Sequence, residues 1–151
     1  MEYRKVHIEY MKETNVAYFR RMGPYGSENG KLMHSFKQWV KAEGLFEGST
    51  ILGIALDNPQ NVPDANCRYD VCLIINKEHL KNNRIKQRPL PSIKYAIFKI
   101  PHTEIAINEF YKKLNQIICE KQLKVLNKPI IERYKQKLVS LGFCEILIPI
   151  E

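Results

Sequence analysis

Glu132 is the residue whose type and position point most directly to chemistry. It lies in the segment 129–134, and if this segment is a strand, Ile130, Glu132 and Tyr134 share one face. A carboxylate on an otherwise apolar and aromatic face is costly to bury unless it is paired or used. Two interpretations remain open: an edge-strand glutamate paired with Arg133 or a nearby lysine, or a carboxylate on the floor of a ligand cleft, where it could bind a cation or position a water.

Two aromatic residues could line the same cleft. Trp39 is the only tryptophan, and it falls on the apolar face of a predicted helix, where core packing is the commoner role. Its alternative role is to offer a flat surface to a ligand. Tyr69 shares a predicted strand face with Val71 and Leu73, and it could both stack on a ligand and hydrogen-bond to it. Asp70 points to the other face, where a cross-strand pair with an arginine is the simpler interpretation.

Motifs for other chemistry are absent from the sequence. It contains no glycine-rich nucleotide loop, no nucleophile elbow, no Cys-x-x-Cys and no His-Glu-x-x-His. The four histidines are scattered along the chain, so we expect no metal site and no cofactor. We expect the four cysteines to be reduced and mostly buried, as in a cytoplasmic protein.

Charge is distributed unevenly along the 151 residues. Lys and Arg number 24 and Asp and Glu 16, and the whole net charge of +8 falls in residues 76–151. The basic stretch 77–88 has no interleaved aromatics and no helix-turn-helix pattern. We therefore expect a solvated basic surface without direct sequence-specific DNA binding. The chain also has no apolar run long enough for a membrane helix and no signal-peptide pattern, so we expect no membrane association.

The elements that must position these residues can be read from periodicity. In the first half, alternation predicts a strand over 6–10 and a hairpin partner over 16–20. A helix follows, with Ser27 as its N-cap and Gly44 as its stop, and then come two strands, 50–56 and 69–75.

In the second half, Pro89 and Pro91 favour an edge strand or a bulge, and a strand is predicted over 93–100. Thr103 is then expected to cap one amphipathic helix that reaches Ile118. Strands over 130–134 and 143–150 complete the chain.

The two halves repeat the same order of elements. Residues 17–20 match residues 96–99 at an offset of 79, and a helix-capping position follows each. We predict an α+β fold in a single domain over 1–151, made of duplicated βαββ repeats (about 1–76 and 85–151) with pseudo-twofold symmetry and one antiparallel sheet. Neither half has enough core alone, and the cleft between two packed halves is a preferred ligand site.

A set of short motifs occurs in one order along nearly the whole chain. The motifs are residues 16–19, 23–25, Phe36 with Trp39, 57–59 with Pro63, 67–70, 128–134 and 145–150. Together they resemble the DNA gyrase inhibitor-like small-molecule-binding family of bacteria. Related domains form the C-terminal effector-binding part of AraC- and MerR-type transcription regulators.

This resemblance implies a site and a function. It implies a central cleft with aromatic walls and an acidic floor, and by position the ligand-binding residues are Glu132, Tyr69, Trp39, Tyr25 and Tyr134. Many members of the family bind lipophilic, often cationic, organic molecules there. The chain has no helix-turn-helix domain, so we expect a stand-alone binding domain that sequesters such compounds or senses them for a partner regulator.

Two alternatives stay open at this point. Some stand-alone members of the family are hydrolases of cyclopropane-bearing genotoxins, and Glu132 would then be the catalytic residue that assists attack by water. Other members inhibit gyrase, so a protein partner such as gyrase or a regulator is the second alternative. The sequence names neither the ligand nor the partner.

Overall fold

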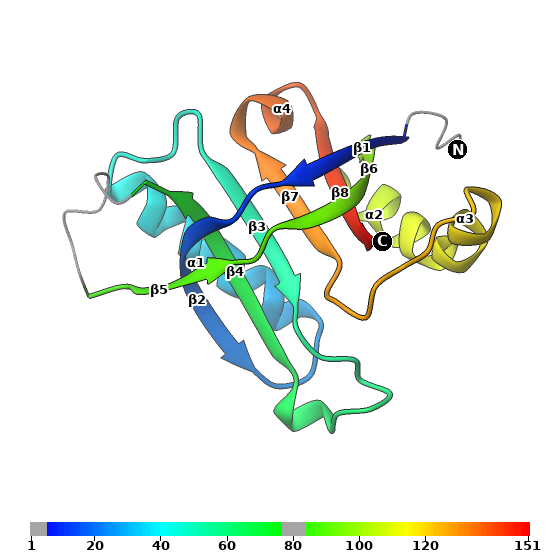
Figure 1. Cartoon of the computed structure of the whole chain (residues 1–151). Coiled ribbons are helices and arrows are strands. Elements are labelled where there is room, and N and C mark those ends of the chain that lie inside the picture. The colour runs from blue at the N-terminus through cyan, green and yellow to red at the C-terminus, as the bar shows by residue number, and fades with distance from the viewer. Residues whose placement is uncertain (1–5, 77–83) are drawn as a thin grey trace.

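The computed structural model describes residues 6–76 and 84–151, which form one eight-stranded antiparallel sheet with helices (Figure 1). The predicted basic connection therefore lies largely outside the described residues. In chain order the elements are β1 (Val6–Met11), β2 (Thr14–Met22), α1 (Ser27–Ala42), β3 (Thr50–Ala55), η1 (Asp64–Asn66), β4 (Arg68–Ile75), β5 (Lys86–Leu90), β6 (Ile93–Pro101), α2 (Glu104–Lys112), α3 (Leu114–Glu120), β7 (Ile131–Lys135), α4 (Gln136–Ser140) and β8 (Phe143–Ile150).

The order of strands in the sheet reflects the duplication. The order is β1-β6-β8-β7-β3-β4-β2-β5, so β7 and β3 meet at the centre. Equivalent strands of the two repeats lie at the same number of strands from this centre, on opposite sides of it. The predicted α+β fold with duplicated repeats is confirmed. In the central pair, the register places Gly53 of β3 directly opposite Glu132 of β7.

The predicted hairpin between residues 6–10 and 16–20 is wrong. β1 pairs with β6 of the second half, and β2 pairs with β4 and with β5. The two halves thus exchange their edge strands. The links between consecutive strands, Lys12 with Glu13 and Pro91 with Ser92, lack the glycine or asparagine that tight hairpin turns require, so each chain segment continues onto the other half.

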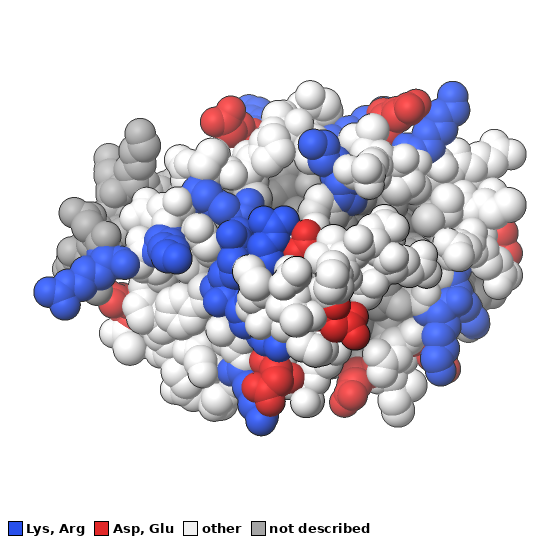
Figure 2. Space-filling view, turned by 90° about the horizontal axis from the view of Figure 1, so that it is seen from below, with Lys and Arg blue, Asp and Glu red and all other residues white. Residues whose placement is uncertain are grey.

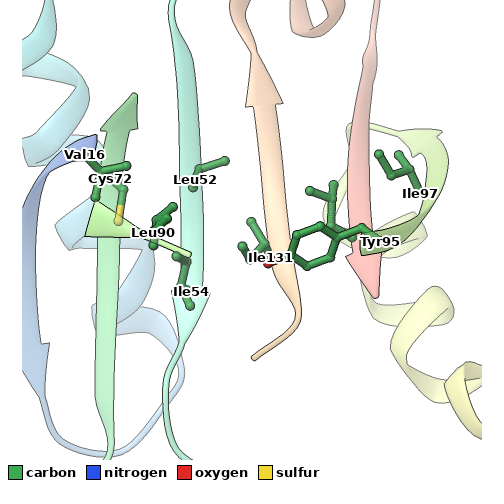
Figure 3. Close-up of a cluster of buried hydrophobic side chains, with 9 residues drawn as sticks. Val16, Leu52, Ile54, Cys72, Leu90, Tyr95, Ile97 and Ile131 are labelled. Carbon is green, nitrogen blue, oxygen red and sulfur yellow. The ribbon is translucent and has the colours of Figure 1, made fainter. Parts of the chain in front are cut away.

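The two faces of the sheet are buried in different ways. On one face the strands pack against helices, with Phe36 and Val40 of α1 over the first half and Phe110 of α2 over the second. The opposite face buries strand residues alone, because the sheet curls and β5 and β6 cross over β3 and β7 (Figure 1). Figure 3 shows part of this second core, in which the side chains of Ile131 and Tyr95 lie against each other.

The helix boundaries differ from prediction in two places. α1 begins at Ser27 itself, with Gly26 at the N-cap position and no side-chain cap. The single helix expected after Thr103 is instead two helices, because Lys113 leaves the helical conformation at φ −97° and ψ 5°. The cap itself is confirmed, since the Ala106 N–H donates to Thr103 Oγ1 at 3.1 Å. α4 was not predicted.

Two clusters of charged side chains, one around the buried Asp70 and one around the buried Arg133, form ion pairs with the exchanged edge strands. Asp70 of β4 is fully buried and accepts from both Arg20 of β2 and Arg88 of β5, which confirms the cross-strand arginine pair predicted for it. In the other half, Arg133 of β7 donates to Glu145 of β8 at 2.9 Å and to Glu9 of β1 at 3.1 Å. Each cluster ties one edge strand to strands that belong to the opposite repeat.

Most charge lies on the surface. Figure 2, which views the molecule from below, shows Lys and Arg side chains gathered near the middle of that face, with acidic side chains more scattered. The four cysteines are free; Cys67, Cys72 and Cys144 are buried as expected, whereas Cys119 is exposed. No helix among the described residues is long and apolar enough to cross a membrane.

Candidate functional site

The floor of the candidate site is the central strand pair. Glu132 and Gly53 lie opposite each other on the face that carries the helices. A Cβ atom on Gly53 would lie 2.6 Å from the Tyr69 hydroxyl oxygen and 3.6 Å from Glu132 Oε1. The missing side chain of Gly53 therefore leaves room for the Tyr69 hydroxyl beside the carboxylate.

Two tyrosines hold the carboxylate of Glu132. The Tyr134 hydroxyl donates to Oε1 at 2.5 Å, and the Tyr111 hydroxyl donates to Oε2 at 2.9 Å. Burial, and then the charge of Glu132, raise the pKa of both tyrosines well above the ordinary value, so both remain protonated donors. Hydrogen bonds to a charged acceptor are strong, and these two fix the position of the carboxylate.

Tyr69 adds a third hydroxyl to this floor. Its side chain is 8% exposed, and burial followed by the charge of Glu132 raises its pKa. Among residues 6–76 and 84–151 the Tyr69 hydroxyl has no hydrogen-bond partner. It is a free donor and acceptor that lines the cleft next to the carboxylate.

These residues form the floor of a cleft of about 730 Å³. This volume is within the range of clefts that hold drug-sized molecules. The start of α1 forms one wall, the junction of α2 and α3 forms the other, and the segments 55–59 and 127–130 close the end. The side chains that line it are mainly apolar and aromatic, with Glu132 on the floor and Asp57 and Lys128 at the rim.

The rim is fixed by Tyr25 and an ion pair. The Tyr25 hydroxyl donates to the Arg68 carbonyl at 2.7 Å and accepts from the Asp57 N–H at 3.1 Å. The Asp57 carboxylate accepts from the Arg68 guanidinium at 2.9 Å and from the Arg68 N–H at 2.8 Å. These bonds to Arg68 hold the pKa of Asp57 below its usual range. The Asp57 charge is therefore neutralised at the rim, whereas no cationic side chain is within ion-pair distance of Glu132 in the described part of the chain.

The structure brings most of the predicted site residues together. Glu132, Tyr69 and Tyr25 line the cleft, and Tyr134 bonds to Glu132 from the same strand. Trp39 does not line this cleft. It packs in the core of the first half, with ring centroids 5.6 Å from Phe36 and 5.8 Å from Phe19.

The structure bears on the first interpretation of Glu132, that of an edge-strand residue paired with a neighbouring cation. β7 is a central strand, and Arg133 is committed to Glu145 and Glu9, so the edge-strand pairing considered for Glu132 does not occur.

Two residues of the floor were not predicted as site residues. Tyr111 falls within the helix predicted after Thr103, and it reaches Glu132 from the point where α2 ends. Gly53 falls within the strand predicted over 50–56. A glycine inside a strand often marks a close approach of another group, and that signal could have singled it out.

Among the described residues no group of three or more His, Cys, Asp or Glu side chains is placed to hold a metal ion. The polar groups on the floor are instead the carboxylate of Glu132 and the hydroxyls of Tyr69, Tyr111 and Tyr134.

The chain belongs to the family of GyrI-like small molecule binding domains, whose model matches residues 4–151. A relative from Bacillus subtilis (strain 168), named "SPbeta prophage-derived putative transcriptional regulator YosT", is 39% identical over 148 residues. The match covers 97% of this chain and 99% of the relative.

Two solved structures share the fold over nearly the whole chain. The EcmrR C-terminal domain superposes with a TM-score of 0.70 at 18% identity and covers 97% of each chain. SAV2435, in a structure bound to tetraphenylphosphonium, superposes with a TM-score of 0.64 at 16% identity, covering 97% of this chain and 94% of that one. At these identities the likeness concerns the fold.

Proposed function

We propose that the cleft binds hydrophobic organic cations, with Glu132 as the counter-charge. One observation carries the proposal: an acidic side chain without a cationic partner among the described residues lies on the floor of a 730 Å³ cleft, between two tyrosine hydroxyls. A partly buried carboxylate attracts a cation, and the faces of Tyr69 and Tyr25 add cation–π attraction.

The comparisons support this ligand class. The family is one of small-molecule-binding domains, and a structural neighbour binds tetraphenylphosphonium, a lipophilic cation that carries aromatic rings and one positive charge. A single carboxylate on the floor matches a single positive charge.

The biological role that we propose is sensing or sequestration. The name of the Bacillus relative links it to transcriptional regulation, which supports a role in sensing through a partner regulator. Sequestration of toxic cations needs only the cleft. Contact with gyrase or a regulator stays a prediction.

The test is the substitution Glu132→Gln, which removes the charge and keeps the shape. We expect the affinity for tetraphenylphosphonium to weaken by about 1–3 kcal/mol, the scale of losing a charged partner. The affinity for neutral triphenylphosphine oxide should change little. Isothermal titration calorimetry measures both ligands on both proteins.

A matched control is Glu109→Gln, because Glu109 is an exposed glutamate of α2 that does not line the cleft. This variant should bind both ligands as the unchanged protein does. If Glu132→Gln leaves the cation affinity unaltered, or weakens the cation and the neutral compound equally, the proposed role of Glu132 is wrong.

Geometry favours binding over hydrolysis. A general base must take a proton from water, but each carboxylate oxygen of Glu132 already accepts a hydrogen bond from a tyrosine hydroxyl. We therefore expect no turnover of a cyclopropane-bearing alkylator. Product formation above a Glu132→Ala control would instead support the hydrolase alternative.

A further inference from the structure

A second cavity lies on the opposite face of the sheet from Glu132. Its volume is about 140 Å³, close to that of an engineered apolar cavity that binds benzene. Ile54 of β3, Leu90 of β5 and Ile131 of β7 line it, and these side chains are buried in the core between the curled halves of the sheet (Figure 3).

An unpartnered hydroxyl lies in this apolar cavity. Tyr95 lines it, is only 4% exposed, and its hydroxyl has no hydrogen-bond partner among the residues that the structure describes. Burial raises the pKa of Tyr95 to about 12, so the hydroxyl is protonated near neutral pH and can donate. The hydroxyl oxygen itself is reached by solvent, so a ligand oxygen at this point would take the place of water as its partner.

The surroundings of the cavity are positive. Arg88 lines it, and this guanidinium shares the single buried carboxylate of Asp70 with Arg20, so the three side chains together carry a net charge of +1. Exposed Lys128 is a second cation among the lining residues. Within the described segments no Asp or Glu lines this cavity. An apolar cavity with a free donor and a positive margin suits an anion with a small apolar body.

We propose that this cavity binds a small aromatic carboxylate of the size of benzoate. The ring would occupy the space among Ile54, Leu90 and Ile131, and the carboxylate would accept from the Tyr95 hydroxyl and face Arg88 and Lys128. This site shares Leu56, Lys128 and Pro129 with the rim of the cleft above Glu132 but lies on the opposite face of the sheet, and it does not rest on the function proposed for that cleft.

Adjacent isoleucines distinguish the two sites. Ile131 lines the second cavity and Ile130 lines the cation cleft, because successive strand residues point to opposite faces. In methyl NMR spectra of the whole chain, benzoate should shift the Ile131 resonance and leave Ile130 in place. Tetraphenylphosphonium should do the reverse. Benzylamine has the same ring with the opposite charge, and it should leave Ile131 unshifted.

Two variants test the polar contacts. Tyr95→Phe keeps the ring and removes only the unpartnered hydroxyl, and it should weaken benzoate about tenfold. Lys128→Gln should weaken benzoate about threefold, since this charge is exposed and screened. Lys121→Gln is the matched control, because Lys121 is an exposed lysine outside both cavities, and it should leave the Kd unchanged.

Three results would overturn the proposal. The first is a benzoate titration that shifts Ile130 but not Ile131. The second is equal shifts of Ile131 by benzoate and benzylamine. The third is an unchanged benzoate Kd in Tyr95→Phe that still gives the spectrum of a folded protein.

Discussion

At the scale of single residues, the cleft depends on a difference between the two repeats at one equivalent position, which is Gly53 in the first repeat and Glu132 in the second. Gly53 and Glu132 are 79 residues apart, the same offset that aligns residues 17–20 with 96–99, and they face each other at the centre of the sheet. The second repeat thus contributes a carboxylate. The first contributes a glycine without a side chain, and the Tyr69 hydroxyl lies where that side chain would be.

This arrangement predicts the effect of Gly53→Ala. The new methyl group would lie 2.6 Å from the Tyr69 hydroxyl, and must displace it. We expect the free energy of unfolding to fall by about 1–3 kcal/mol, the usual cost of overpacking a core, and tetraphenylphosphonium to bind less tightly. Urea unfolding and calorimetry measure the two effects.

Gly30→Ala is the matched control for this substitution. Gly30 lies in α1, and beyond its own helix backbone no atom of the described residues lies within 4 Å of an added Cβ, so alanine there should stabilise the protein by up to about 1 kcal/mol. Equal effects of the two substitutions on unfolding would contradict the steric role assigned to Gly53.

At the scale of elements, α2 is the helix that carries Tyr111 to the cleft, and its first turn is capped by Thr103. Thr103 caps the start of α2, and Tyr111 near its end donates to Glu132. Between them Phe110 packs in the core of the second half, with its ring 5.3 Å from that of Phe98. The short helix is therefore held at both ends and in the middle, which fixes one wall of the cleft.

Thr103→Ala should destabilise the protein by about 1 kcal/mol, because the Ala106 N–H loses its acceptor. Thr103→Ser should restore most of this loss, since serine also accepts at an N-cap. Ser35→Ala, an exposed substitution within α1, should change stability little. Thermal unfolding compares the three variants, and a loss in Thr103→Ser as large as in Thr103→Ala would contradict the capping role.

At the scale of the whole molecule, the two repeats are joined by exchange of β1 and β5 and by an ion cluster on each side. Asp70 holds Arg88 of β5, and Arg133 holds Glu9 of β1. Burial by itself would raise the pKa of Glu145, but Arg133 outweighs burial and holds this pKa below the ordinary value. Each half therefore depends on a strand that belongs to the other.

We expect Asp70→Asn to destabilise the whole protein by about 3 kcal/mol, because two arginines lose the buried charge that they share. Unfolding in urea should remain a single transition, since neither half has its complete sheet alone. Asp64→Asn, at an exposed aspartate of η1, is the control and should have little effect. Similar midpoints for the two variants would show that the Asp70 cluster is not a major link.

The positions of the strands and of the first helix could be predicted from the sequence because alternation and helical spacing are local patterns. The same period-two rule placed Glu132 and Tyr134 on one face, and their hydrogen bond agrees with it. The ordered motifs also predicted the family, which the match over residues 4–151 confirms. The excess of basic residues in the second half did not indicate where the cleft lies, because the floor of the cleft has a single negative charge, that of Glu132.

Only the tertiary structure decided which strands pair and which residues meet. β1 pairs with β6 rather than with its neighbour β2, and Tyr111 near the end of α2 donates to Glu132, which lies 21 residues further along the chain. For Trp39 the sequence favoured the core over a ligand role without deciding between them, and in the structure it packs against Phe36. Local periodicity determines which face of an element is apolar, but the partner of that face is chosen by burial and hydrogen bonding between segments far apart in the chain.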